Sequence, residues 1–200
     1  MPGAVTSTYG LIERARAGDQ EAFAELFHSY RRRLAVLVHY QLSPALRGTL
    51  EIDDILQETF LRAFRDLRSF RYESPGSFMR WLARVAQHVI VDTARYHGRR
   101  QRQAGEQVPL RDAGDSGGPE PADSRTPSRL LREAEGLRAL LVQFDALPPD
   151  YREVILLSKV EGLSTAEVAE RLGRTRQATA VLLHRAVKRL REVRERLPQT

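Results

Sequence analysis

Residues 53–102 constrain the fold most, because they hold two long helical patterns in direct succession. In the first, apolar residues recur at the spacing of one helix face: Ile52, Ile55, Leu56, Phe60, Ala63, Phe64 and Leu67. The second follows a break at residues 71–76 (RYESPG), and its core side is Phe78, Trp81, Leu82, Val85 and Val89. The two stripes predict helices packed around a shared core.

Both helices also carry polar faces away from the core stripe. The first begins with Asp53, Asp54, Gln57 and Glu58 and continues with Arg62, Arg65 and Arg68. The second carries Arg80, Arg84, His88 and Arg95, followed by Arg99, Arg100 and Arg102. Acidic residues first and basic residues last suit the helix dipole, so a solvated, helix-stabilising face is one interpretation. A pair of binding surfaces is the other.

The order of residues in these two blocks resembles the conserved second region of the sigma-70 superfamily, above all its small extracytoplasmic-function members. DDILQETFLRAF and SFMRWLARVAQHVIVDTAR are similar to D-L-V-Q-E-T-F-L-R-A-W and F-x-x-W-L-x-R-I-A-x-N-x-x-I-D-x-x-R. The matching residues are Asp54, Gln57, Glu58, Thr59, Phe60, Arg62, Ala63, Phe78, Trp81, Leu82, Arg84, Ala86, Asp92 and Arg95. His88 departs from the pattern, because the family usually has asparagine there.

The composition is that of a basic chain without cysteine. Among 200 residues, 32 Lys and Arg stand against 26 Asp and Glu, for a net charge of +6. Most of the basic residues are arginine, which suits phosphate and base-edge contacts. Without cysteine there are no disulfides, and the five histidines show no metal-binding spacing, so we expect no cofactor. With no long apolar run and no signal pattern, we expect a soluble cytoplasmic protein without membrane insertion.

Enzyme motifs are missing from the sequence. Asp53, Asp54 and Glu58 resemble the acidic metal motif of isoprenoid synthases, but the second acidic motif that such enzymes need is absent. There is no phosphate-binding glycine loop, nucleophile elbow or HExxH motif. We therefore expect no catalysis.

The residues before position 53 predict a tail followed by helices. Residues 1–9 have the character of a frayed tail, and a short helix from Leu11 is expected to end at Gly18. Asp19 can cap the next helix, which carries Phe23, Leu26, Phe27, Tyr30, Leu34 and Leu37 at helical spacing. Residues 41–50 are predicted to be a loop.

The second helix of the 53–102 stretch has its own expected limits. Ser74 is expected to cap it, with Pro75 at the first helical position. We expect it to end near His97 and Gly98.

Residues 104–129 form the predicted linker. Residues 104–128 hold four glycines, four prolines and no aromatic residue, so they cannot bury enough apolar area to offset the entropy of ordering. Residues 104–136 carry 4 basic and 7 acidic residues, whereas residues 1–103 carry 16 and 11 and residues 137–200 carry 12 and 8. The expected organisation is therefore a domain at 1–103, a flexible linker at 104–129 and a domain at 130–200.

The C-terminal part has the layout of a helix-turn-helix. A helix near residues 130–144 precedes one opened by Pro148 and Pro149 and closed by Gly162. Ser164 and Glu167 then form a capping box before a short helix that ends near Gly173 and turns into a long basic helix. By spacing alone, an ordinary helical hairpin is an equal alternative. LPPDYREVILLSKVEGLSTAEVAERLG and LLHRAVKRLRE, however, resemble the fourth region of sigma factors.

The resemblance implies an all-α protein of two small helical domains that acts as an RNA polymerase sigma factor. Its partners would be RNA polymerase core enzyme and promoter DNA, and an anti-sigma factor is a further candidate. The implied polymerase-binding residues are Asp53, Asp54, Gln57 and Glu58. The implied DNA-binding residues are Arg80, Arg84, His88, Arg95, Arg99, Arg100, Arg174, Arg176, Gln177, Arg185, Lys188 and Arg189. The alternative is a stand-alone helix-turn-helix transcription regulator.

The last helix departs from the family pattern L-G-x-P-x-G-T-V-K-S-R-L-H-R-A. Ala180, Val181 and Leu182 replace the usual lysine, serine and arginine. Apolar side chains cannot donate hydrogen bonds to guanine, so we expect DNA affinity here to come mostly from phosphate contacts, with weak discrimination among bases.

Overall fold

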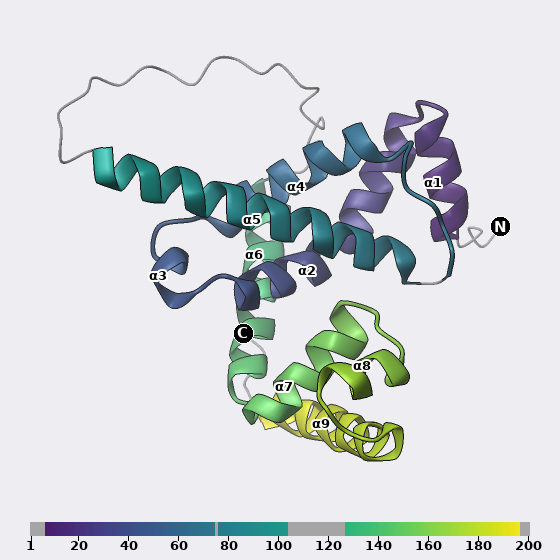
Figure 1. Ribbon diagram of the computed structural model, residues 1–200, viewed down its shortest axis with the longest axis vertical. Coiled ribbons are helices and arrows are strands. Elements are labelled where there is room, and N and C mark those ends of the chain that lie inside the picture. The colour runs from purple at the N-terminus through teal and green to yellow at the C-terminus, as the bar shows by residue number, and fades with distance from the viewer. Residues whose placement is uncertain (1–6, 75, 104–126, 197–200) are drawn as a thin grey trace.

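A computed structural model describes residues 7–74, 76–103 and 127–196, and these residues form helices and no strands (Figure 1). The N-terminal module contains α1 (Thr8–Arg16), α2 (Gln20–Gln41), α3 (Pro44–Arg47), α4 (Ile52–Asp66) and α5 (Ser77–Gln103). The C-terminal module contains α6 (Pro127–Asp145), α7 (Pro149–Ile155), the π-helical turn η1 (Leu156–Val160), α8 (Thr165–Arg171) and α9 (Arg176–Arg196). The all-helical, two-domain prediction is confirmed. Residues 104–126 of the predicted linker lie outside the described residues, and its predicted end at residue 129 was wrong, because α6 already begins at Pro127.

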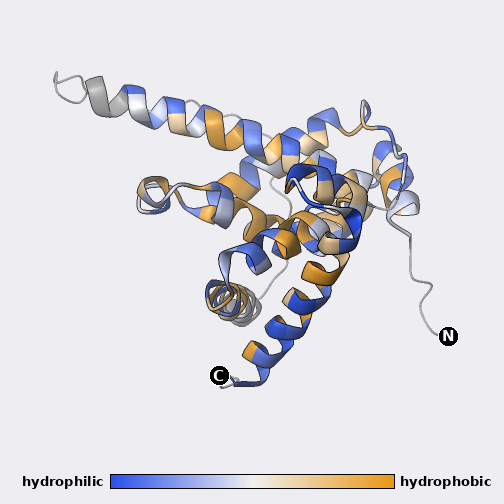
Figure 2. Cartoon of the chain, turned by 60° about the horizontal axis from the view of Figure 1, so that its bottom comes forward, coloured by the Kyte–Doolittle hydropathy of each residue, from blue (hydrophilic) through white to orange (hydrophobic). Residues whose placement is uncertain are grey.

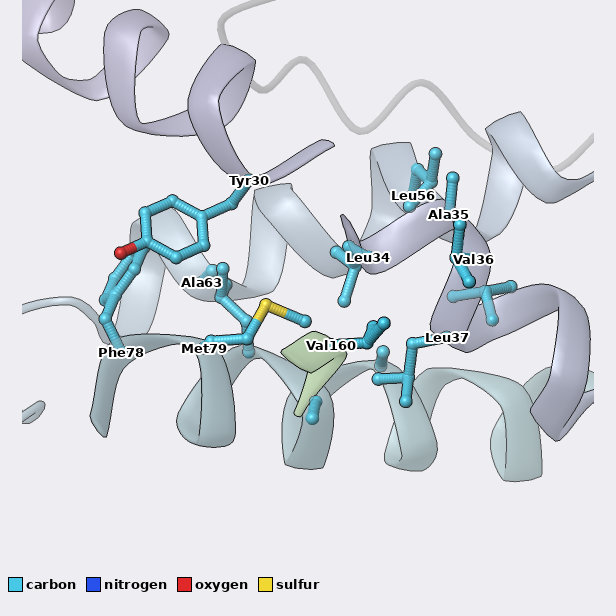
Figure 3. Packing of buried hydrophobic residues seen from close by; sticks show 14 of the residues in the cluster. Tyr30, Leu34, Ala35, Val36, Leu37, Leu56, Ala63, Phe78, Met79 and Val160 are labelled. Carbon is cyan, nitrogen blue, oxygen red and sulfur yellow. The ribbon is translucent and has the colours of Figure 1, made fainter. Parts of the chain in front are cut away.

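The N-terminal core lies between α2, α4 and α5, which pack against one another. Leu34, Ala63 and Met79 contribute fully buried side chains from these three helices, as Figure 3 shows. Phe60 and Phe78 add aromatic rings to the same core. The apolar stripes predicted from the sequence are thus the buried faces, except at Phe64, which is 36% exposed.

Local capping explains two differences from the predicted boundaries. The Ser7 side chain accepts the backbone N–H of Gly10 at 3.1 Å, so α1 begins at Thr8 and the prediction of a tail through residue 9 was wrong. Within the predicted loop at 41–50, Pro44 opens the short helix α3 and Ser43 caps it. Asp19 caps α2 as predicted, by accepting the N–H of Ala22.

The limits of α5 also differ from those predicted. The helix begins at Ser77, because Gly76 has a φ of 98°, a left-handed conformation that cannot be part of a right-handed helix. The Ser74 hydroxyl accepts from Arg80 rather than from the helix N-terminus, so the predicted cap was wrong. At the other end, Gly98 does not adopt the left-handed conformation that ends many helices, and α5 continues to Gln103.

The C-terminal module has the predicted helix-turn-helix. Ser164 and Glu167 form the capping box of α8, and Gly173, with a φ of 61°, makes the turn into α9. Thr179, Ala186 and Val193 form the buried stripe of α9. The sequence did not predict that the helix after Pro149 changes to π-helical geometry at Leu156.

The two modules meet along α2 and the N-terminal end of α5. Val160 of η1 lies beside Leu34, Leu37 and Met79 (Figure 3). One guanidinium nitrogen of Arg33 donates to the carbonyl oxygens of Lys159 at 3.0 Å and Val160 at 3.1 Å. The contact between the modules therefore combines apolar side chains with hydrogen bonds from Arg33.

No described helix is long and apolar enough to cross a membrane.

Candidate nucleic-acid and protein interfaces

The four implied polymerase-binding residues lie together on the first turns of α4. Asp53, Asp54 and Gln57 are exposed, and Glu58 is half-buried. The side chains of Asp53, Asp54 and Gln57 face solvent because the opposite side of α4, with Ile55 among its residues, is buried in the core. Asp53 accepts a hydrogen bond from Arg31 at 2.9 Å and still keeps 71% of its side chain exposed. The structure therefore brings these residues together as an accessible acidic face.

Arg62 connects this acidic face to α5. Its Nε donates to Glu58 at 2.7 Å, and its Nη1 donates to Asp92 at 2.7 Å. The hydrogen bond from Arg62 lowers the pKa of Asp92, and Arg95 and His88 act in the same direction. The same bonds, first that of Asp92 and then that of Glu58, raise the pKa of Arg62. The sequence offered no spacing signal for the contact with Asp92, because Arg62 and Asp92 belong to different helices.

The basic stripe of α5 is exposed along most of its length. Arg84, His88, Arg95 and Arg99 face solvent, and the side chain of Arg100 lies outside the described residues. The C-terminal part of α5 extends past the rest of the N-terminal module (Figure 1). A protruding helix with aligned cations can contact phosphates without steric hindrance from its own domain.

Two apolar side chains accompany this stripe, and sequence reasoning did not select them. Val91 and Tyr96 are 38% and 52% exposed on α5. Tyr96 offers an exposed ring on which a base can stack. The sequence signal was weak, since single exposed apolar residues are common on protein surfaces.

Arg80 is placed apart from the other stripe residues. It is half-buried, and its two terminal nitrogens donate to the carbonyl oxygen of Gly162 at 3.1 Å and to the Ser74 hydroxyl at 3.2 Å. Gly76 and Gly162 approach so closely that a Cβ on Gly76 would lie 3.2 Å from the carbonyl oxygen of Gly162. Gly76 and Arg80 therefore contact the C-terminal module.

Aromatic rings lie beside the same segment. Trp81 packs against Phe70 with 5.0 Å between ring centroids and against Phe78 with 5.6 Å. Tyr72 lies in the segment itself, with its ring centroid 5.4 Å from that of Tyr9. Tyr9 is 52% exposed. Phe70 and Phe78 are buried, so the rings that can offer a stacking surface here are those of Tyr9, Tyr72 and Trp81.

The implied DNA-binding residues of α9 and its preceding turn are also exposed, with one exception. Arg174, Arg176, Gln177, Arg185 and Lys188 face solvent. Arg189 is half-buried and pairs with Glu192 at 3.1 Å.

Arg174 is tied to α7, because it donates to Asp150 at 2.7 Å. This exposed ion pair links the turn before α9 to α7, the helix that precedes the helix-turn-helix. The Thr175 hydroxyl accepts the N–H of Ala178 at 3.1 Å and caps the start of α9. The helix that would enter a DNA groove is thus held at its N-terminal end by two local contacts.

Comparison with known proteins assigns both modules to one family. The family model described as "Sigma-70 region 2" matches residues 26–100, and the one described as "Sigma-70, region 4" matches residues 137–190. The chain is 32% identical over 182 residues to the RNA polymerase sigma factor CarQ of Myxococcus xanthus, covering 91% of this chain and 94% of that protein.

Other relatives agree. The ECF RNA polymerase sigma-E factor of Haemophilus influenzae is 32% identical over 161 residues, which cover 80% of each chain. ECF RNA polymerase sigma factor BldN of Streptomyces coelicolor is 30% identical over 90% of this chain, which spans 63% of the length of BldN. The solved structure of CnrH in complex with the cytosolic domain of CnrY is 24% identical, with a TM-score of 0.43 over 92% of this chain and 95% of that chain. At that TM-score, the sequence matches are what assign the family.

Proposed function

Because this chain belongs to the extracytoplasmic-function group of the sigma-70 family of RNA polymerase sigma factors, we propose that it directs promoter-specific transcription initiation. In this proposal the module at 1–103 binds core polymerase and the downstream promoter box. Residues 104–129 connect it to the module at 130–200, which binds the upstream box as duplex DNA. The protein works where core polymerase is, in the cytoplasm, and performs no catalysis of its own.

The observation that carries the proposal is the pairing of opposite surfaces on α4 and α5. The acidic face of α4, with Asp54 at its centre, suits a basic coiled coil of the polymerase. The basic stripe of α5 suits the DNA backbone. The Glu58–Arg62–Asp92 bridge joins the two helices and helps to orient the acidic surface relative to the basic one.

Promoter opening requires a place for an unstacked base. Flipping a base out of the duplex costs about a few kcal/mol, which stacking on aromatic rings and nearby positive charge can offset. We propose that residues 72–76, with Tyr72 and the adjacent Trp81, receive that base. Arg84, His88, Arg95 and Arg99 then hold the phosphates beside it. Since His88 replaces the usual asparagine, base preference here is specific to this chain.

The C-terminal module is proposed to place α9 in the major groove. In helix-turn-helix proteins the second helix contacts base edges while the first lies across the backbone. Arg176, Arg185 and Lys188 face solvent on α9 and can contact phosphates on either side of the groove. An anti-sigma factor would act by covering one of these surfaces.

Run-off transcription with purified core polymerase on genomic fragments tests the proposal. We expect specific transcripts only when the chain is added, and loss of both transcription and core binding in Asp54→Arg. Charge-assisted hydrogen bonds are each worth about 1.5–3 kcal/mol, so reversing a central charge should weaken core binding more than tenfold.

The matched control is Asp66→Arg, which makes the same charge change at the opposite end of α4. Asp66 is exposed and has no ion pair in the described part of the structure. Equal loss of binding in both variants would show a non-specific charge effect. Sequence-specific DNA binding without any complex with core polymerase would instead identify a stand-alone regulator.

A further inference from the structure

The helix-turn-helix carries a basic segment that no acidic residue interrupts and that includes most of α9. Residues 171–191 contain seven basic residues and no acidic one. Figure 2 shows hydrophilic colouring over much of this helix near the C-terminal mark. Such a segment attracts a polyanion, and a duplex is the polyanion proposed for this module.

An apolar groove lies within this basic segment. Ala178, Val181 and Leu182 form its apolar lining, in a hollow of about 450 Å³ that Arg174, Gln177 and Arg185 also line. Val181 is 46% exposed. Single exposed apolar side chains are ordinary, but here three line one groove together with two arginines.

The groove faces away from the rest of the module. Thr179, Ala186 and Val193 form the buried side of α9, and Val181 lies on nearly the opposite side of the helix. The fold therefore does not need an apolar residue at Val181. Leu182 is half-buried and packs against the core, so the fold explains part of the need for an apolar residue there.

We propose that this groove recognises the C5-methyl group of thymine in the upstream promoter box, an inference that rests on the function proposed above. On base edges in the major groove, the thymine methyl is the apolar group that an apolar groove can hold. Apolar side chains offer nothing to the acceptors of guanine. The flanking arginines match the charge of the phosphates on both sides, which selects duplex DNA rather than an apolar protein surface as the occupant.

Gln177 extends this readout. Its side-chain amide can form a bidentate pair with adenine, using one donor and one acceptor. It lies next to Ala178 at the edge of the groove. Together the two contacts favour an upstream box with an A·T pair at the groove and weak selection elsewhere.

Replacing thymine by uracil tests the proposal, because it removes the methyl group and leaves every hydrogen-bonding group of the base in place. The full chain, reconstituted with core polymerase, first selects upstream boxes from random-sequence duplexes. The selected box is then made with deoxyuridine at one thymine position at a time. We expect about fourfold weaker binding at one or two positions, the effect of burying one methyl-sized group.

Variants locate the effect on the groove. In Val181→Ala the ratio of the affinities for the thymine and uracil boxes should fall toward one, because the methyl group loses its contact. Val181→Thr keeps the shape of the side chain but places a hydroxyl in the groove, so it should also lower this affinity ratio. Val142→Ala is the matched control, since Val142 is 55% exposed on α6, outside the groove, and it should keep the full difference.

Three outcomes decide the matter. Equal binding of thymine and uracil boxes by the wild-type holoenzyme would overturn the proposal, even if Val181→Ala weakened binding to both. A difference that persists unchanged in Val181→Ala would also overturn it. If the chain forms no complex with core polymerase, the proposed function fails and this inference fails with it.

Discussion

Arg62 shows how one side chain can serve two helices. It donates to Glu58 on its own helix and to Asp92 on α5, at 2.7 Å in each case. The pair with Glu58 has the i, i+4 spacing expected on a helix surface. The pair with Asp92 depends on how α4 and α5 pack. A contact of this kind orients the acidic and basic surfaces more than it stabilises the fold, because partly exposed ion pairs contribute little.

We predict that Asp92→Asn lowers the urea midpoint slightly at neutral pH. Because Arg62 lowers the pKa of Asp92 in the folded state, the stabilisation is present above about pH 4 and is lost as the pH falls through the folded-state pKa. Urea unfolding of the wild-type and variant proteins at several pH values measures this. The difference between their urea midpoints should shrink in acid. Asp66→Asn is the control. A difference that stays constant down to pH 2 would rule out the charged pair as its cause.

At the scale of single elements, α8 is the clearest case of a helix specified by its own sequence. The Ser164 side chain accepts the N–H of Glu167 at 3.3 Å, and Glu167 accepts the N–H of Ser164 at 2.7 Å. Hydrogen bonds from the side chain and the backbone N–H of Ser164 lower the pKa of the Glu167 carboxyl group. Because α8 is only seven residues long, losing the cap affects a large share of the helix.

We predict that Ser164→Ala lowers the free energy of unfolding of the C-terminal module by about 1 kcal/mol, the usual cost of losing an N-cap. Thermal unfolding followed by circular dichroism measures it. Thr165→Ala, an exposed position one residue later, should have little effect. Equal losses in the two variants would mean that the capping box does not stabilise α8.

At the scale of the whole molecule, the contact between the modules covers part of the proposed promoter-reading surface. Arg80 donates to Gly162, and Tyr40 donates to Asp145 at 2.8 Å. Burial and the neighbouring Asp145 raise the pKa of Tyr40, so its hydroxyl stays protonated as the donor. If residues 72–76 receive a base, this contact opens in the promoter complex.

We predict that Arg33→Ala separates the modules, because two hydrogen bonds to the carbonyls of η1 are lost. The chain has no cysteine, so single cysteines introduced at the exposed positions Gln20 and Glu195 can carry a fluorophore pair. Lower energy-transfer efficiency in the variant is the expected result. Arg65→Ala, an exposed arginine on α4, should leave the efficiency unchanged. Unaltered efficiency in Arg33→Ala would show that this arginine does not hold the modules together.

The sequence by itself determined the features that depend on neighbours three or four residues apart. These are the apolar stripes of α4 and α5 apart from Phe64, the Asp19 cap and the capping box of α8. The exposed acidic and basic faces were predictable for the same reason, since a stripe opposite a core face must meet solvent or a partner.

Only the tertiary structure decided the contacts between distant residues. Arg33 meets Lys159 at a separation of 126 residues, and Arg62 meets Asp92 at 30. The start of α5 belongs here as well, because Gly76 lies against Gly162 of the other module. Helical periodicity relates residues within a few turns of one another. Which helix faces which, and hence the separation of Arg80 from the other arginines of its helix, is set by how the packed modules bury their apolar surfaces.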